Sequence, residues 1–567
     1  MRVALLQLSL QAGALKANFE KLISAASQDC KNADLFVAPE MTFLGYPLRD
    51  LLSYPSYLQE EAKLLDQFIL KSKEFPDNAF VVGHSQVDGE QLFNCASLIA
   101  NGEILGSHRK CHLPDYDIFD EYRFFTAGSH LQKSVFNWKG KKIGLNVCAD
   151  IMDHAPHYGD NDKKYYFPKE SPLNIQSEAE ILINTSASPY VLGKYKARWN
   201  IVRDHARRLK KAIIYVNCVS VQDDIIFDGH SFAYNENGHK TLQAPSFKEG
   251  TFIVDTNDSS NAMTMQDSGT EINSPSKRSD WDDFHRGIIW GIREYFQKNG
   301  FSKAVLGLSG GVDSALCARL LAEALGQENI HGVMLSTAHN SPESLQLAAE
   351  LATRLSIQYS EHSIDEECGH LKQKLKLETK SLSYQNLQAR LRALILMSQA
   401  NGENRLLVST GNKSELAMGY STLYGDLAGA VSPLGDLYKT EVYGLSHYLN
   451  CLDQKEKGNA SIPFEILDRA PSAELADQQK DSDSLPSYEI LDTVLYDLIE
   501  NQALNSGDSR WTELLKKEAF SSYQQIFKTV HQQEFKRQQA PLIFKFHRRS
   551  FGSGWRIPIS KSLPNMD

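Results

Sequence analysis

Residues 305–314, VLGLSGGVDS, constrain the fold more than any other stretch of this sequence. They join an apolar run that predicts a buried strand, 304–308, to a helical pattern over 315–325. A second apolar strand, 331–335, follows directly, so the segment predicts a βαβ unit and a parallel sheet. Two adjacent glycines let backbone N–H groups turn toward an anion, and the helix N-terminus adds its positive dipole. The loop therefore predicts a phosphate-binding site.

The side chains of this loop suit phosphate chemistry. Ser309 and Ser314 supply hydroxyl groups, and Asp313 can hold a divalent cation against phosphate oxygens. An arbitrary Ser-Gly-Gly is more often a plain turn capped by Ser and Asp, but the strand before it and the helix after it favour a phosphate site. The loop is neither a Walker loop, since no Gly-Lys-Ser/Thr follows, nor the Gly-x-Gly-x-x-Gly of dinucleotide folds.

The 567 residues divide into two α/β domains at a polar stretch. Residues 1–255 alternate short apolar runs with helical patterns such as 58–70 and 196–210, which is typical of an α/β domain. Residues 256–280 are rich in Ser, Asn, Asp, Gly and Pro without periodicity, and they predict a linker. Residues 281–567, which contain the βαβ unit, form the second domain, and no internal repeat relates the two.

Composition and charge exclude several classes of function. The 60 basic and 70 acidic residues leave a net charge of −10, which gives no electrostatic case for nucleic-acid binding. The most basic segment, 194–211, has eight Lys or Arg residues in eighteen and predicts a solvated helix face. The sequence has no run of 18 apolar residues, so no membrane helix is expected, and no His-Glu-x-x-His or Cys-x-x-Cys pattern points to a transition metal. Eight sparse cysteines favour reduced thiols and a cytoplasmic location.

Three short segments of the first domain carry side chains for amide hydrolysis by a thiol. They are APEMTFLGYP with Glu40, HRKCHLPDYDIFDE with Lys110 and IGLNVCADI with Cys148. A thiol that attacks an amide needs a general base, a donor for the oxyanion and a proton for the departing ammonia. Glu40 can move the proton, Lys110 can stabilise the oxyanion and Cys148 can carry the acyl group. A lone Cys after a strand is more often a core residue, so the set as a whole supports this interpretation.

The phosphate loop and the segments after it resemble known families. SGGVDS resembles the pyrophosphate loop of N-type ATP pyrophosphatases, which have a Rossmann-like parallel-sheet domain and split ATP between its α and β phosphates. Four downstream segments are similar to those of NAD synthetases. They are residues 409–426 (STGNKSELAMGYSTLYGD), 436–445 (DLYKTEVYGL), 470–492 and 534–541.

This resemblance implies roles for individual residues of the second domain. Magnesium would be held by Asp313 and Glu415, and deamido-NAD would be contacted by Asn386, Glu415 and Lys536. The chemistry asks for such residues, because the carboxylate of nicotinate must approach a triphosphate, and magnesium and Lys439 offset the repulsion. The residues implied for ATP are Gly307, Leu308, Ser309, Gly310, Gly311, Val312, Asp313, Ser314, Thr410, Lys439 and Ser472.

The three segments of the first domain resemble the Glu–Lys–Cys nitrilase superfamily, and in particular the glutamine amidase domain joined to NAD synthetases. The resemblance implies a nitrilase-like α-β-β-α sandwich with Glu121 as a second glutamate that orients Lys110. It also implies that Tyr116, Ser188 and Lys194 bind glutamine. The sequence departs from the family at a few positions, which are Ala149 in place of Glu, Ser220 and Val221 in place of a Gly-Gly pair, Gln385 in place of Glu and Leu335 in place of Pro.

The two resemblances together predict one reaction. Glutamine hydrolysis releases ammonia, which converts deamido-NAD into NAD through an adenylated intermediate, with release of AMP, pyrophosphate and glutamate. ATP is the co-substrate, Mg²⁺ is the expected metal, the partners are small molecules, and the resemblance implies a homo-oligomer. Two alternatives remain open: an ATP-pyrophosphatase ligase that amidates another carboxylate or acts on transfer RNA, and a non-catalytic sensor of dinucleotides.

Overall fold

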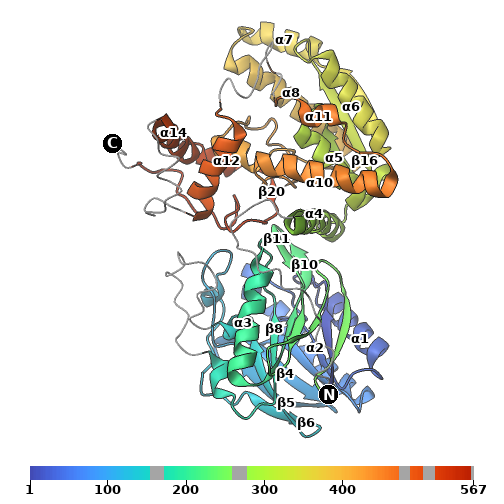
Figure 1. Cartoon of the computed structure of the whole chain (residues 1–567), viewed down its shortest axis with the longest axis vertical. Coiled ribbons are helices and arrows are strands. Elements are labelled where there is room, and N and C mark those ends of the chain that lie inside the picture. Colours follow the sequence, from blue (N-terminus) through green and yellow to red (C-terminus); the bar gives the residue numbers. More distant parts are fainter. Residues whose placement is uncertain (153–170, 258–277, 472–474, 476–484, 502–517, 564–567) are drawn as a thin grey trace. The chain divides into compact units, whose positions relative to one another are not determined.

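The computed structural model describes residues 1–152, 171–257, 278–471, 475, 485–501 and 518–563. The chain forms two compact units, Met1–Asn273 and Ser274–Asp567, and Figure 1 labels many of their elements. The division falls inside the polar stretch 256–280. Residues 258–277 of that stretch, and Ser472 of the expected ATP contacts, lie outside the described residues.

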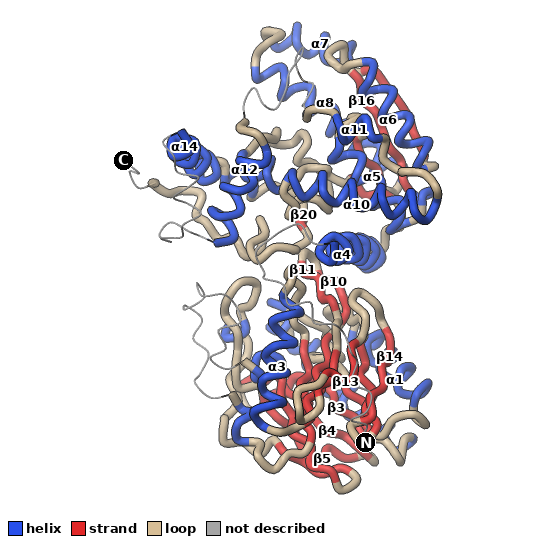
Figure 2. The backbone as a smooth tube through the Cα atoms, viewed as in Figure 1, coloured by secondary structure: helices blue, strands red, loops and turns tan. Residues whose placement is uncertain are grey.

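The first unit is built on two six-stranded sheets, each with parallel strands at its centre and antiparallel strands at its edges. Figure 2 draws the strands in red. The first sheet has the order β14 (Gly250–Asp255), β1 (Arg2–Gln7), β2 (Leu35–Val37), β3 (Ala79–Asp88), β4 (Gln91–Ala100) and β5 (Glu103–Arg109). The second has the order β13 (Lys240–Gln243), β12 (Phe232–Tyr234), β9 (Ala212–Asn217), β8 (Ile181–Ser186), β7 (Lys141–Val147) and β6 (Val135–Trp138). A separate hairpin joins β10 (Val219–Gln222) to β11 (Ile225–Asp228).

Alternate residues of β1 show how the layers form. Val3 and Leu5 belong to the buried cluster between the two sheets, whereas Ala4 and Leu6 pack on the other face, in a cluster that includes Phe68 of a covering helix. Successive side chains of a strand point to opposite faces, so a strand that is buried on both sides must be apolar throughout. The covering helices are α1 (Leu15–Asp29) and α2 (Pro55–Lys71) on this sheet and α3 (Lys194–Leu209) on the second sheet.

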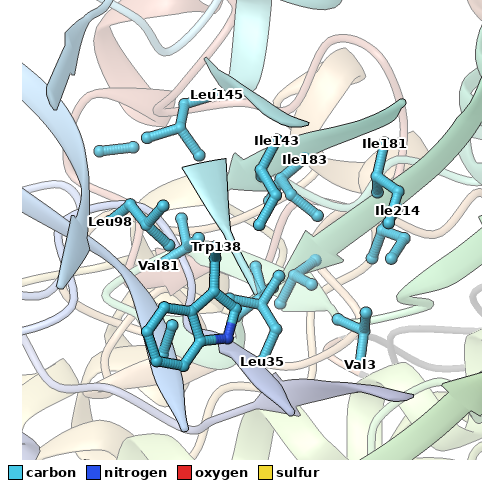
Figure 3. Packing of buried hydrophobic residues seen from close by; sticks show 14 of the residues in the cluster. Val3, Leu35, Val81, Leu98, Trp138, Ile143, Leu145, Ile181, Ile183 and Ile214 are labelled. Atoms are coloured by element: carbon cyan, nitrogen blue, oxygen red, sulfur yellow. The ribbon is translucent and has the colours of Figure 1, made fainter. Parts of the chain in front are cut away.

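The cluster between the sheets brings together residues that are far apart in sequence (Figure 3). Leu35 and Val81 of the first sheet pack in it with Ile143 and Ile183 of the second. Apolar faces of two sheets therefore meet in the middle and helices cover the outside, which confirms the predicted α-β-β-α sandwich. Short 3₁₀ turns link several elements: η1 (Arg49–Ser53), η2 (Ser72–Glu74), η3 (Glu121–Arg123), η4 (Cys148–Ile151) and η6 (Pro172–Ile175).

The second unit contains a four-stranded, wholly parallel sheet, as the βαβ pattern predicts. Its order is β17 (Gln358–Ser363), β16 (Ile330–Ser336), β15 (Ala304–Gly307) and β18 (Leu406–Leu407), and a small pair joins β19 (Val431–Ser432) to β20 (Leu542–Ile543). The α-helices are α4 (Arg278–Lys298), α5 (Val312–Leu325), α6 (Pro342–Leu355), α7 (Asp365–Leu375), α8 (Leu382–Glu403), α9 (Lys413–Met418), α10 (Lys439–Lys457), α11 (Phe464–Asp468), α12 (Tyr488–Tyr496), α14 (Glu518–Gln532) and α15 (Glu534–Arg537). A 3₁₀ turn, η7 (Gln327–Asn329), and a π turn, η9 (Asp497–Asn501), complete the described elements. No described helix of either unit is long and apolar enough to cross a membrane.

The structure corrects two expectations from the sequence. The helix expected from 315 begins at Val312, because Gly311 ends the loop in an extended conformation and caps α5. The first unit also contains antiparallel hairpins that a simple alternation of strands and helices does not predict. The turn between β4 and β5 is Asn101–Gly102, with φ of +51° and +84°, the turn that a right-twisted hairpin favours.

Candidate active sites

Cys148 lies at the point where β7 ends and η4 begins. Its φ of +43° is in the left-handed region, which is unfavourable for a residue with a Cβ atom. The turn is held by Asp150, whose Oδ2 accepts the N–H of Val147 at 3.0 Å. The strand therefore delivers the thiol on a sharp, fixed turn at its carboxyl end.

Lys110, immediately after β5, is held between two glutamates. Its Nζ donates to Glu40 Oε1 at 2.7 Å and to Glu121 Oε1 at 2.8 Å, and all three side chains are buried. Tyr46 donates its hydroxyl to the same oxygen of Glu121 at 2.7 Å. The structure thus brings Glu40, Lys110 and Glu121 together as predicted.

Glu40 is itself fixed from two sides. Its Oε1 accepts Asn94 Nδ2 at 2.7 Å, and its Oε2 accepts the N–H of Ala187 at 2.8 Å. Asn94 lies on β4, and its carbonyl oxygen accepts the N–H of Lys110 at 2.8 Å. Sequence reasoning missed Asn94, although a polar residue inside the apolar run LFNCASLIA was a signal for it.

The protonation states of Cys148 and Lys110 suit amide hydrolysis. Burial, and then the nearby Glu40, raise the pKa of Cys148 to about 12, so the resting thiol keeps its proton and needs a base. Burial alone would lower the pKa of Lys110, but the carboxylates of Glu121 and Glu40 outweigh it and raise that pKa. Lys110 therefore remains an ammonium, which is the form that can stabilise an oxyanion.

One pocket contains Cys148 together with the three residues expected to bind glutamine, Tyr116, Ser188 and Lys194. Burial lowers the pKa of Lys194 to about 8. Arg198, one turn further along α3, also lines the pocket and is paired with Asp228. The basic segment 194–211 is thus a solvated face only in part: Arg207 and Arg208 are exposed, whereas the inner side of α3 places Lys194 and Arg198 at the pocket.

Gly83 on β3 packs against the backbone of the segment that carries Glu40. A Cβ atom at this position would be 2.5 Å from the carbonyl oxygen of Pro39 and 2.7 Å from the Cα of Glu40, both backbone atoms. Gly83→Ala should therefore displace Glu40 and lower glutaminase turnover by about 100-fold, because a shift of about 1 Å in a catalytic group has that effect. The measurement is glutamate release. Gly369→Ala, at a helical position of α7 where a Cβ atom would meet open space, is the matched control. Unchanged turnover in Gly83→Ala would show that the backbone contact does not place Glu40.

The phosphate loop of the second unit has the backbone that its glycines predict. Gly310 has φ of +77°, and a Cβ atom there would lie 2.5 Å from the carbonyl oxygen of Ser344. Ser314 Oγ accepts the N–H of Ser309 at 3.2 Å and donates to Gly311 O at 3.0 Å. The two serines therefore stabilise the loop itself, between Gly307 and Leu308 at the end of β15 and Val312 at the start of α5.

A charged cluster borders this loop. Lys439 Nζ contacts Asp313 Oδ2 at 2.5 Å and Glu415 Oε1 at 3.1 Å, and Asp313 Oδ1 accepts Asn412 Nδ2 at 2.8 Å. Lys439 is 2% exposed, so it is not a solvated surface lysine. The two carboxylates expected to hold magnesium thus reach one common cation. Asn412, which caps α9, is a further member that sequence reasoning did not single out.

The remaining predicted residues lie around the same sheet edge or the turn after α9. Thr410 follows β18, which pairs in parallel with β15, so both strands end at one edge. Asn386 Oδ1 accepts the hydroxyl of Thr422 at 2.8 Å. Lys536 Nζ donates to the carbonyl oxygens of Gly419 at 2.7 Å and Ser421 at 2.8 Å. Asn386 and Lys536 therefore both contact the segment 419–422 that follows α9.

Comparisons with known proteins match each half of the chain to a family. The carbon-nitrogen hydrolase family model matches residues 2–158, and the NAD synthase model matches residues 285–540. Glutamine-dependent NAD(+) synthetases from Synechocystis sp. and Acinetobacter baylyi are 37% and 34% identical to the chain; the match covers 99% of both chains for the first and 98% of both for the second. The structure of the Acinetobacter baumannii enzyme of the same name, in complex with ADP, is 32% identical, covers 98% of each chain and gives a TM-score of 0.72. The enzyme of that name from Cytophaga hutchinsonii shares the fold at 20% identity and a TM-score of 0.79, over 99% of this chain and 98% of its own.

A sandwich with a partly buried Cys beside a buried Glu and Lys, and a parallel sheet with a phosphate loop, define an enzyme that joins an amidase to an ATP-dependent ligase. Both halves match their family models. The chain belongs to the glutamine-dependent NAD(+) synthetases. It is a carbon–nitrogen ligase that uses ATP and forms NAD with nitrogen from glutamine.

Proposed function

We propose that the first unit hydrolyses glutamine at Cys148 and that the second unit uses the ammonia to amidate an adenylated deamido-NAD. The observation that carries this proposal is the buried Lys110 ammonium, paired with Glu40 and Glu121 and close enough to Cys148 to influence its pKa. The reaction consumes deamido-NAD, ATP, glutamine and water, and yields NAD, AMP, pyrophosphate and glutamate.

In the glutaminase half-reaction Glu40 takes the thiol proton while Cys148 Sγ attacks the carboxamide carbon of glutamine. Lys110 stabilises the oxyanion that develops. The C–N bond then breaks, Glu40 returns the proton, and ammonia leaves. Water hydrolyses the thioester with Glu40 as base, and glutamate is released. Glu121 keeps Lys110 in place, and Tyr116, Ser188 and Lys194 hold the substrate in the pocket.

In the synthetase half-reaction a carboxylate oxygen of deamido-NAD attacks the α-phosphorus of ATP, and pyrophosphate leaves. Ammonia then attacks the carbonyl carbon of the adenylate and releases AMP. The loop 309–311 and the N-terminus of α5 hold phosphate oxygens, with Thr410 and Lys439 nearby. Asn386, Glu415 and Lys536 bind deamido-NAD, and Ser472 remains a prediction for ATP.

Magnesium suits the residues of this site. Asp313 and Glu415 supply hard carboxylate oxygens, and both already pair with one cation, Lys439. When bound, the metal supplies neutralisation of phosphate charge. We also propose a cytoplasmic location, which the eight free cysteines support. The homo-oligomer stays a prediction.

The stoichiometry of the products tests the proposed function. Purified chain supplied with glutamine, ATP, Mg²⁺ and deamido-NAD should form NAD and AMP in equal amounts, with at least as much glutamate. Omission of deamido-NAD should stop AMP formation, because no other carboxylate accepts the adenylyl group. AMP formation that persists with nicotinate mononucleotide in its place would instead indicate a ligase for a different substrate.

A further inference from the structure

Asp150, two residues after the nucleophile, accepts hydrogen bonds from four donors. Its Oδ1 accepts the N–H groups of Cys111 and His112, each at 2.9 Å. Its Oδ2 accepts the N–H of Val147 at 3.0 Å and Nε2 of His108 at 2.7 Å. Asp150 is fully buried, so every one of these bonds is made away from water.

The spacing of His108, Cys111 and Asp150 would also allow a metal ion, because their ligand atoms lie within 4.8 Å of one another. Hydrogen bonds already engage these atoms. His108 Nδ1 contacts Ser134 Oγ at 2.7 Å, and the four donors occupy both oxygens of Asp150. Burial raises the pKa of Cys111, so its sulfur is a thiol rather than the thiolate that a metal binds. The cluster is therefore a hydrogen-bonded anchor.

The four donors come from the two chain segments that carry the catalytic pair. Cys111 and His112 directly follow Lys110 at the end of β5, and Val147 directly precedes Cys148 at the end of β7. These two strands belong to different sheets of the sandwich. One carboxylate thus ties together the end of a strand from each sheet, within one residue of Lys110 on one side and of Cys148 on the other.

We propose that Asp150 is a positioning residue that sets the Lys110 ammonium against the Cys148 sulfur, so that the ammonium meets the oxyanion when it forms. This inference rests on the proposed roles of Lys110 and Cys148. Burial alone would raise the pKa of Asp150, but the hydrogen bond and charge of His108 and the backbone donors lower it to about 2, so the carboxylate is ionised at neutral pH. Only a carboxylate accepts hydrogen bonds at both of its oxygens. An amide in its place would turn its NH₂ group toward two of the donors.

Asp150→Asn tests the proposal in the full chain. Glutamate release should fall about 100-fold in kcat, with the KM for glutamine within about threefold, because misplacement of an oxyanion donor acts on the transition state. Alkylation of Cys148 by iodoacetamide should fall by less than about tenfold, because sulfur displaces iodide without forming an oxyanion and loses only the influence of Lys110 on the thiol pKa. NAD formation from ammonia should be unchanged. Asp88→Asn is the matched control, because this exposed carboxylate accepts from Arg109, the residue before Lys110.

A pair of milder substitutions keeps the proposal testable if Asp150→Asn does not fold. His108→Gln retains an N–H donor toward Asp150, whereas His108→Leu removes it. We expect near-normal turnover for His108→Gln and a loss of about tenfold for His108→Leu, the effect of one charge-assisted hydrogen bond. Equal turnover of the two variants would count against the proposal.

Three results would overturn the inference. The first is full glutaminase turnover in Asp150→Asn. The second is a parallel fall of turnover and of Cys148 alkylation, which would mean that Asp150 only supports the nucleophile turn. The third is a rise in KM with normal kcat, which would place Asp150 in substrate binding. The proposed function can fail independently of this inference. If alkylation of Cys148 left glutamate release by the wild-type chain intact, Cys148 would not be the nucleophile, and the proposed function itself would be wrong.

Discussion

Cys148→Ala should abolish NAD formation from glutamine while NAD formation from ammonia continues at the wild-type rate. The expected loss is at least about 10⁴-fold, because the acyl group has no other nucleophile to carry it. The thiol is fixed at the end of β7, in the pocket that holds Tyr116 and Lys194. Alanine removes the sulfur but keeps the turn, and the synthetase unit has a separate core. The measurement is the rate of NAD formation with each nitrogen source in turn.

Cys30→Ala is the matched control for this variant. Cys30 is a partly exposed thiol that follows α1 in the same unit, and its sulfur donates to the carbonyl oxygen of Ser27. It should retain both activities. Loss of both activities in Cys148→Ala would contradict the assignment of glutamine hydrolysis to the first unit, and retained use of glutamine would exclude Cys148 as the nucleophile.

Asp313→Ala should stop NAD formation with either nitrogen source and leave glutamine hydrolysis measurable. The expected loss is about 10³-fold or more, because the proposed metal ligand and one of the two carboxylate partners of Lys439 disappear from the site where the phosphate charge develops. Asp313 also accepts Asn412 Nδ2, so the variant loosens the cap of α9 next to Glu415. The rates of AMP and NAD formation should therefore fall together.

Glu343→Ala provides the matched control, since Glu343 is an exposed acid in the first turn of α6, as Asp313 is in the first turn of α5. It should behave as wild type. Asp313→Asn removes the charge of the side chain but keeps its shape, and it should be nearly as inactive as Asp313→Ala. Substantial NAD formation by Asp313→Asn would remove the proposed metal role of this residue.

Much of the fold follows from local patterns. The loop 309–314 has its geometry because glycine alone tolerates the backbone of Gly310, and that requirement is visible in one short string of letters. Helices α2 and α3 and the central strands follow from the period of their apolar residues. Glu40, Lys110 and Cys148 could be selected because a thiol, a base and a cation are the groups that amide hydrolysis requires.

Lys413, in the string GNKSE, has an environment that local sequence patterns do not predict. Lysine side chains are rarely fully buried, yet Lys413 is completely buried. Its Nζ donates to Asp436 Oδ1 at 2.7 Å, Glu500 Oε1 at 2.6 Å and Arg549 O at 2.8 Å. These partners lie between 23 and 136 residues away, so no local pattern predicts them. Packing of the C-terminal segment against α9 decides the environment of this charge.

The sequence by itself determined the chemistry of each half: which groups can attack, donate or hold phosphate, and that they follow strands. Only the tertiary structure decided that Lys110 is shared by Glu40 and Glu121, that Asn94 holds Glu40, and that Asp150 ties two sheets together. The reason is physical. Backbone periodicity and side-chain reactivity are local properties, whereas the distances among groups 11 to 70 residues apart depend on how the sheets pack.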